Sequence, residues 1–179
     1  QSDFEDPGIA PVIFDELGFN ARFMRLVVEK GQIEDGVEFF ALSEIFVMEQ
    51  RESGMVDVAP YSQRSTSAHF QSYPYWDIRF LADRLSPLGF PLGVDSARDT
   101  DFIAELPAAA ENETVEFVFD MAETRKIGRI AFYPADPPSN ILLPHFGYPD
   151  RLVIEVFNDA SMERPVYRME VQPDYKLRK

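Results

Sequence analysis

The chain has 179 residues, and its 31 acidic and 17 basic side chains give a formal net charge of −14. This charge argues against nucleic-acid binding, in which Lys and Arg replace the counterions of the phosphates, and against attachment to anionic lipid by charge alone. The chain has no Cys, which excludes disulfides, a thiol nucleophile and Cys-ligated metal, and it has no run of 18 apolar residues that would predict a membrane span.

The first third is predicted to contain two strands. Residues 1–13 include two prolines and are expected to form a flexible lead-in. Apolar and polar side chains alternate over residues 22–29, which predicts a strand, and the apolar run 39–48 predicts a second and central strand. Glu44 is the only charged residue inside that run, and it needs a partner because an unpaired buried carboxylate is costly.

The middle third is predicted to be mostly loop. Residues 61–75 are rich in Ser, Tyr and Gln and predict a long loop, whereas the apolar spacing in residues 76–85 predicts a short helix. Residues 86–101 carry Pro, Gly and acidic side chains and predict a second loop, which leads into a strand at 102–106.

The last third is predicted to form strands again. Alternation of side chains predicts four strands, at residues 114–120, 126–133, 151–157 and 166–171. A proline-rich loop, 134–149, lies between the second and third of these, and the tail 172–179 is expected to fray. About seven strands, long polar loops and little helix predict an all-β jelly-roll β-sandwich with one or two short helices, formed by a single domain over residues 1–179.

Three segments of the last third form a pattern that is known from one family. They are Phe119–Met121, Ile127–Phe132 and Pro149–Asp159. These segments resemble the central strands of discoidin-like domains, the coagulation-factor type C family with a galactose-binding-like fold. Asn158 stands where that family usually has Ser.

The remaining family segments are present in an unusual order. The opening segment is resembled by Val58–Ala59, Ala68 and Leu81–Asp83, with Arg84 where Gly is usual. The closing pair of strands is resembled by Ala21–Val28 and Phe40–Val47, which precede the opening segment. The order indicates either a circular permutation within one domain or the tail of one domain followed by the head of the next. We expect the permutation, because half a sandwich would expose sheet edges and an open core, and because domain termini often lie close together.

The resemblance implies a structural Ca²⁺ site. Many bacterial members of the family hold Ca²⁺ with an Asp and a Glu that correspond to Asp83 and Glu44, together with backbone carbonyls, and such oxygen ligands suit Ca²⁺. The alternative is that Glu44 pairs with an arginine such as Arg22, Arg84 or Arg98. Arg84 next to Asp83 is well placed in the sequence to replace the ion.

The resemblance also implies a binding module, often for carbohydrate, and sugar sites use aromatic platforms with a few polar groups. The first candidate platform consists of Tyr73, Tyr75 and Trp76, with His69, Asp77 and Arg79 next to it. The second consists of His145, Phe146 and Tyr148. The alternatives are that Trp76 fills the core and that His145 is an ordinary surface-loop residue.

The sequence contains no motif of a nucleophile elbow, a zinc protease or a phosphate-binding loop. Asp95, Asp99 and Asp101 are candidates for the carboxylate pair of a glycoside hydrolase, but we expect them to lie in a solvated loop. We therefore predict a non-catalytic carbohydrate-binding module. A protein–protein interaction module is the alternative, which the acidic N-terminal third favours. The first residues lack the basic and apolar regions of a signal peptide, so we expect a processed piece of a longer exported protein, extracellular or periplasmic, that carries other domains.

Overall fold

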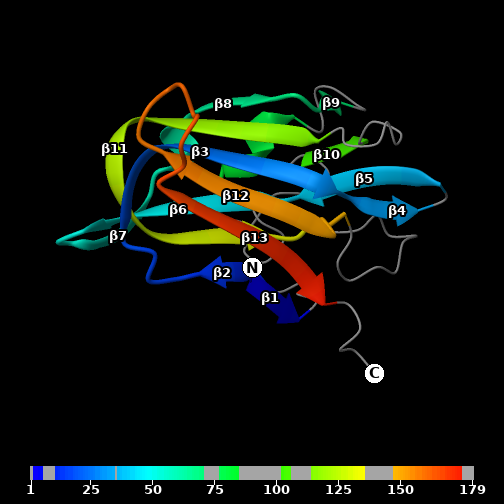
Figure 1. Ribbon diagram of the computed structural model, residues 1–179, viewed down its shortest axis with the longest axis horizontal. Coiled ribbons are helices and arrows are strands. Elements are labelled where there is room, and N and C mark those ends of the chain that lie inside the picture. The colour runs from blue at the N-terminus through cyan, green and yellow to red at the C-terminus, as the bar shows by residue number, and fades with distance from the viewer. Residues whose placement is uncertain are drawn as a thin grey trace, which may run out of the picture.

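The computed structural model (Figure 1) describes residues 2–5, 11–34, 36–70, 77–84, 102–105, 114–135 and 147–174. Within these ranges the regular elements are strands and two short 3-10 helices, which confirms the predicted all-β class. The same residues include no helix whose length and hydropathy would allow it to cross a membrane.

The strands form two sheets. Their bounds are β1 (Ser2–Glu5), β2 (Val12–Phe14), β3 (Phe19–Lys30), β4 (Gln32–Glu34), β5 (Val37–Leu42), β6 (Glu44–Arg51), β7 (Gly54–Asp57), β8 (Gln63–Thr66), β9 (His69–Phe70), β10 (Phe102–Glu105), β11 (Val115–Tyr133), β12 (Arg151–Phe157) and β13 (Tyr167–Asp174), and the 3-10 helices are η1 (Ala59–Tyr61) and η2 (Ile78–Ala82). The large sheet has the order β1-β13-β12-β3-β11-β6-β7, with β2 and β8 also paired to β11, and the small sheet has the order β4-β5-β10-β9. Among the described strands, only the β1–β13 pair is parallel.

Strand β11 organises the large sheet. It is 19 residues long and curls around one end of the molecule (Figure 1), with a shift in its register to β3 between Asp120 and Arg125. Its first half pairs with β3 and β8, and its second half pairs with β2 and β6. Arg22 of β3 holds the bend through two hydrogen bonds to Asp120, at 2.8 and 2.9 Å. The two strands predicted at 114–120 and 126–133 are therefore one bent strand.

The two sheets share one hydrophobic core. Phe40 of β5 in the small sheet lies 5.2 Å from Phe117 of β11 in the large sheet, measured between ring centroids, and both side chains are buried. Leu81 of η2 and Tyr148 belong to the same core. Side chains of both sheets and of one loop are therefore excluded from water together, and this burial is the main favourable contribution to folding.

The prediction of a single central strand at residues 39–48 is wrong in one respect. It is two strands, β5 and β6, which belong to different sheets and are separated at Ser43. The backbone N–H of Ser43 donates to the carbonyl of Tyr133, so the chain passes from one sheet to the other at this residue. All residues from Phe39 to Ile45 are buried, because this segment crosses between the sheets and is covered on both faces.

Several segments predicted as irregular contain strands. The lead-in contains β1 and part of β2, the segment between the first two predicted strands contains β4, and the loop predicted at 61–75 contains β8 and β9. Strand β13 extends to Asp174, into the tail that was expected to fray. Most of these strands have two to four residues, which is too short for side-chain alternation to be recognised.

Strand β3 lies at the centre of the large sheet. It pairs in antiparallel fashion with β11 on one side and with β12 on the other. The N-terminal segment that resembles the family's closing strand is thus in the same sheet as the segments that resemble its central strands. A permutation within one domain requires this arrangement.

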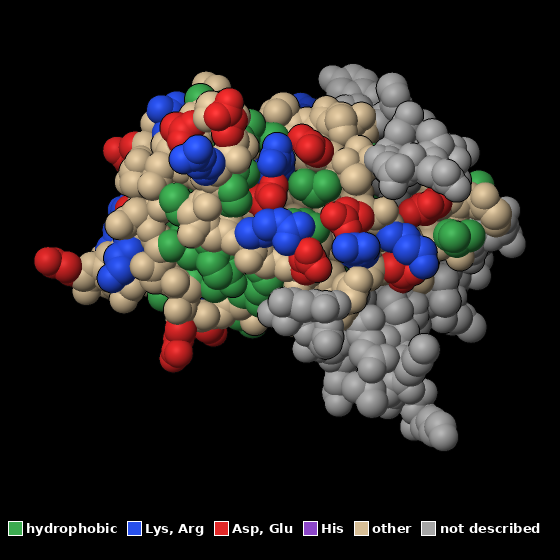
Figure 2. Space-filling view, viewed as in Figure 1, with side chains coloured by type: hydrophobic (Ala, Val, Ile, Leu, Met, Phe, Trp, Pro, Cys, Tyr) green, Lys and Arg blue, Asp and Glu red, His purple; other side chains and the backbone are tan. Residues whose placement is uncertain are grey.

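The outward side of β3, β12 and β13 carries ion pairs (Figure 2). Glu155 lies between Arg25, at 2.7 Å, and Arg168, at 3.3 Å, and Lys30 lies 3.2 Å from Asp150. The basic side chains in this part of the sheet therefore neutralise acidic neighbours, and the ion pairs leave it little net charge with which to bind an ion.

Candidate functional site

The sequence-predicted pair of carboxylates lies where η2 meets the large sheet. Glu44 is the first residue of β6, opposite Tyr133 of β11, and its side chain is completely buried. Asp83 follows η2 as its C-terminal capping residue. The tertiary structure therefore brings together two acidic residues that are far apart in the sequence.

The environment of Glu44 contains a donor and a second carboxyl group. The backbone N–H of Arg84 donates to Glu44 Oε2 at 2.9 Å, whereas Glu44 Oε1 has no hydrogen-bond partner among the described residues. Burial and, to a lesser extent, the nearby carboxyl group of Asp83 raise the pKa of Glu44 from 4.5 to about 9. Two neighbouring carboxyl groups are stable with a proton shared between them or with a cation next to them.

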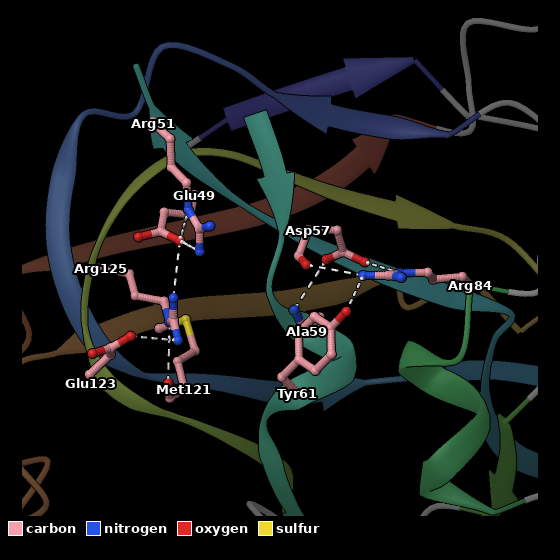
Figure 3. Close-up of polar contacts among 9 residues, drawn as sticks. All are labelled: Glu49, Arg51, Asp57, Ala59, Tyr61, Arg84, Met121, Glu123 and Arg125. Carbon is pink, nitrogen blue, oxygen red and sulfur yellow. Dashed lines mark hydrogen bonds and ion pairs between the residues drawn. The ribbon is translucent and has the colours of Figure 1, made fainter. Parts of the chain in front are cut away.

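The alternative in which an arginine neutralises Glu44 is not what the described residues show. Arg22 pairs with Asp120, and the side chain of Arg84 turns to Asp57 (Figure 3). Arg98, the third arginine considered, lies outside the described residues. Neither described arginine forms an ion pair with Glu44.

Asp57, at the end of β7, is a third acidic residue near the pair. It is 8% exposed, and its Oδ1 accepts hydrogen bonds from the backbone N–H groups of Val47 and Ala59 at 3.3 and 3.1 Å. Its Oδ2 lies 3.5 Å from Nε of Arg84. Burial raises the pKa of Asp57, although these hydrogen bonds and Arg84 oppose the shift. Sequence reasoning missed this residue. It could have been noticed as a single acid between two apolar residues, Val56 and Val58, a position that favours burial.

Arg84 has an unusual backbone conformation. Its φ is +71°, in the left-handed region that commonly follows the end of a helix and that glycine adopts without strain. For a residue with a Cβ this conformation costs about 1 to 2 kcal/mol. A glycine at this position would adopt the same φ without this cost.

The carboxyl groups fit a cation site in part. The described residues contain no three acidic or histidine side chains arranged to hold a metal. Ca²⁺ takes six to eight oxygen ligands and accepts backbone carbonyls and water among them. Glu44 and Asp83 would supply two carboxylates, and the Glu44 oxygen without a donor is the kind of atom that a cation satisfies.

The proposed sugar-binding residues are only partly described. Tyr73, Tyr75, Trp76 and His145 lie outside the described residues, and of His69 only the backbone, in β9, is described. Arg79 is exposed, and its Nε lies 3.3 Å from Asp77 Oδ1. A ligand at the surface could therefore reach its guanidinium group. Tyr148 is different, because its side chain is completely buried in the core. We therefore correct the view of Tyr148 as a binding platform: it is a core residue.

The segments that hold the proposed aromatic platforms, 71–76 and 136–146, each have one end near the small sheet. Segment 71–76 follows Phe70 of β9, and segment 136–146 precedes Gly147, whose carbonyl accepts a hydrogen bond from the backbone of Ala41 in β5. The small sheet places β10 between β9 and β5. Neighbouring strands lie about 4.8 Å apart, so the two attachment points are within about 15 Å of each other.

Comparison of the chain with protein-family models, with curated proteins and with solved structures gives no match. The function is therefore inferred from the residues and from the geometry of the site.

Proposed function

We propose that this chain is a non-catalytic, exported binding module with a jelly-roll β-sandwich of the discoidin-like type, that it binds carbohydrate, and that it is attached to other domains in a longer protein. The sequence resemblance is the source of this proposal. Two sheets with a shared core and the central position of β3 support the fold.

One observation carries the proposal, namely the contact between Glu44 and Asp83. The resemblance selects these two residues, which come from different family segments, as ligands of one ion. In the structure the carboxyl group of Asp83 lies near enough to Glu44 to help raise its pKa, and Glu44 has no basic partner among the described residues. A buried carboxyl group next to a second one needs a compensating proton or cation, and a cation here would agree with the resemblance.

A bound Ca²⁺ would be held by Glu44 and Asp83 together with neighbouring oxygens, and it would supply the positive charge that this site lacks. Its role would be structural, because it would tie the end of η2 to the start of β6. In such a module the ligand binds elsewhere, on loops that the sheets position. The described residues next to segments 71–76 and 136–146, Phe70 and Gly147, lie at the small sheet, which supports a binding surface near that sheet.

The carbohydrate function is tested with a glycan array and affinity electrophoresis on common polysaccharides. We expect binding that is lost in Trp76→Ala and largely retained in Trp76→Phe, because the Phe ring keeps an apolar face for the sugar. Far-UV circular dichroism and thermal melting of both variants verify that the fold is intact. Absence of glycan binding together with a specific protein partner would favour the interaction module, and hydrolysis of a glycan would refute the non-catalytic assignment.

The cation site is tested by calorimetric titration of the EDTA-treated protein with Ca²⁺. We expect one site per chain, loss of binding in Glu44→Gln and unchanged binding in Glu52→Gln, whose side chain is exposed in the turn between β6 and β7. Equal binding by both variants would remove Glu44 from the site.

A further inference from the structure

Residue 84 makes contacts through its backbone and through its side chain, and any residue other than proline could make the backbone contact. Its backbone N–H donates to Glu44 Oε2 at 2.9 Å, and its φ is +71°, in the left-handed region. A glycine would adopt this conformation without strain. The presence of an arginine in a strained conformation therefore calls for a reason in the contacts of its side chain.

The side chain of Arg84 contacts the end of β7 and η1 (Figure 3). Nη2 donates to the backbone carbonyl of Asp57 at 3.3 Å and to the hydroxyl of Tyr61 at 3.4 Å, and Nε lies 3.5 Å from Asp57 Oδ2. The guanidinium carbon also lies 5.3 Å from the centre of the Tyr61 ring. Each contact is long, but a planar guanidinium makes all of them at once from one conformation.

Asp57, the acidic residue that Arg84 contacts, is itself held in place by hydrogen bonds. Asp57 accepts hydrogen bonds from the backbone of Val47 in β6 and of Ala59 in η1. Arg84 therefore connects the residue after η2 to a carboxylate that is itself bound to the large sheet. The backbone N–H of Arg84 also binds Glu44 in β6. The end of η2 is therefore linked to β6 by the backbone of Arg84 and to the end of β7 by its side chain.

We propose that Arg84 is a positioning residue that assembles the Glu44–Asp83 pair in the absence of a cation. Its side chain fixes the chain directly after Asp83, and this keeps the N–H of residue 84 and the Asp83 carboxyl group against Glu44. In this chain the guanidinium of Arg84 thus helps to hold the end of η2 against the sheet. The inference rests on the proposed function only in that a cation site is what the assembled pair would serve.

The test is hydrogen exchange of the backbone amide of residue 84, measured in EDTA and expressed as a protection factor so that differences in intrinsic rates cancel. In Arg84→Gly we expect protection at residue 84 to fall about tenfold and the melting temperature to fall, although the glycine relieves the backbone strain. Asp57→Asn keeps the acceptor for the two backbone N–H groups but loses the charge, and we expect it to lower protection at residue 84 as well. Arg79→Ala, which alters the exposed arginine within η2, is the matched control and should leave that protection unchanged.

A different result would overturn the positioning role of Arg84. If the side chain of Arg84 has no positioning role, Arg84→Gly keeps its protection factor within twofold and becomes more stable, because the strain is gone. Arg84→Lys provides a milder change if the glycine variant does not fold, since it keeps the charge but makes fewer simultaneous contacts, and unchanged protection there would also overturn the proposal. A calcium titration of the wild type separates this inference from the proposed function, because failure to bind Ca²⁺ refutes the cation site and leaves the exchange result as the measure of Arg84.

Discussion

Replacing Glu44 by Gln is expected to stabilise the calcium-free protein at pH 8, although the change removes a buried side chain that accepts a hydrogen bond. Gln keeps a carbonyl oxygen for the backbone N–H of Arg84, and its amide group can donate to Asp83. It carries no charge that has to be removed from water. The wild-type carboxyl group must instead be protonated, or remain charged against Asp83, whenever the protein is folded.

The size of the effect follows from the pKa of Glu44, which is raised from 4.5 to about 9, chiefly by burial. Because the folded state has the higher pKa, the stability associated with this group is fully present below pH 4.5 and is lost as the pH rises to about 9. At about 1.4 kcal/mol per pH unit, the loss at pH 8 is about 5 kcal/mol as an upper bound. Asp57, whose pKa is also raised by burial, contributes with the same sign.

The assay is urea denaturation in EDTA at pH 5 and pH 8. The wild type should be more stable at pH 5, whereas Glu44→Gln should lose less stability between the two pH values and exceed the wild type at pH 8. Glu52→Gln, an exposed control, should follow the wild type. The reasoning is refuted if Glu44→Gln is the less stable protein at pH 8 in EDTA, or if its pH dependence equals that of the wild type. Saturating Ca²⁺ should restore the advantage of the wild type, because only the carboxylate binds the ion.

Three further substitutions test how the sheets are held. Gly147→Ala should destabilise the protein by about 3 kcal/mol in chemical denaturation, because φ is +65° and an added Cβ would lie 2.6 Å from the backbone nitrogen of Ala41; a change below 1 kcal/mol would show that this loop shifts freely. Arg125→Met should cost about 2 kcal/mol, because Arg125 lies 3.0 Å from Glu49 at the bend of β11 and both side chains are mostly buried; an unchanged melting temperature would exclude a role in the bend. Phe117→Ala should cost about 3 to 5 kcal/mol through the cavity it leaves between the sheets, and a cost near 1 kcal/mol would contradict tight packing there.

Side-chain alternation was sufficient where a strand is long and has one buried face. The predicted strand 151–157 coincides with β12, and the predicted strand 22–29 lies within β3. It was insufficient at residues 39–48, because both faces of residues 39–45 are buried and the pattern does not distinguish one strand from two. It also failed at the bend of β11, because Ala122–Thr124 are exposed and read as a turn although the strand continues through them.

At the candidate site, too, some residues could be selected from the sequence and others could not. The resemblance selected Glu44 and Asp83, and it identified residue 84 as a position where glycine is usual. It did not indicate Asp57, because a single acid in a short strand has no distinctive spacing. It also allowed Arg84 to be the counter-ion of Glu44, since sequence separation does not say which way a side chain points.

The sequence by itself determined the all-β class, the absence of cysteine chemistry and the need of Glu44, a lone acid in an apolar run, for a partner. These follow from composition and from local patterns, which depend on neighbouring residues only. The tertiary structure alone decided that β3 pairs with both β11 and β12, that Tyr148 is a core residue, and that Arg84 turns to Asp57 and leaves Glu44 facing Asp83. Each of these depends on contacts between distant segments, whose free energy is set by burial and charge in the folded chain.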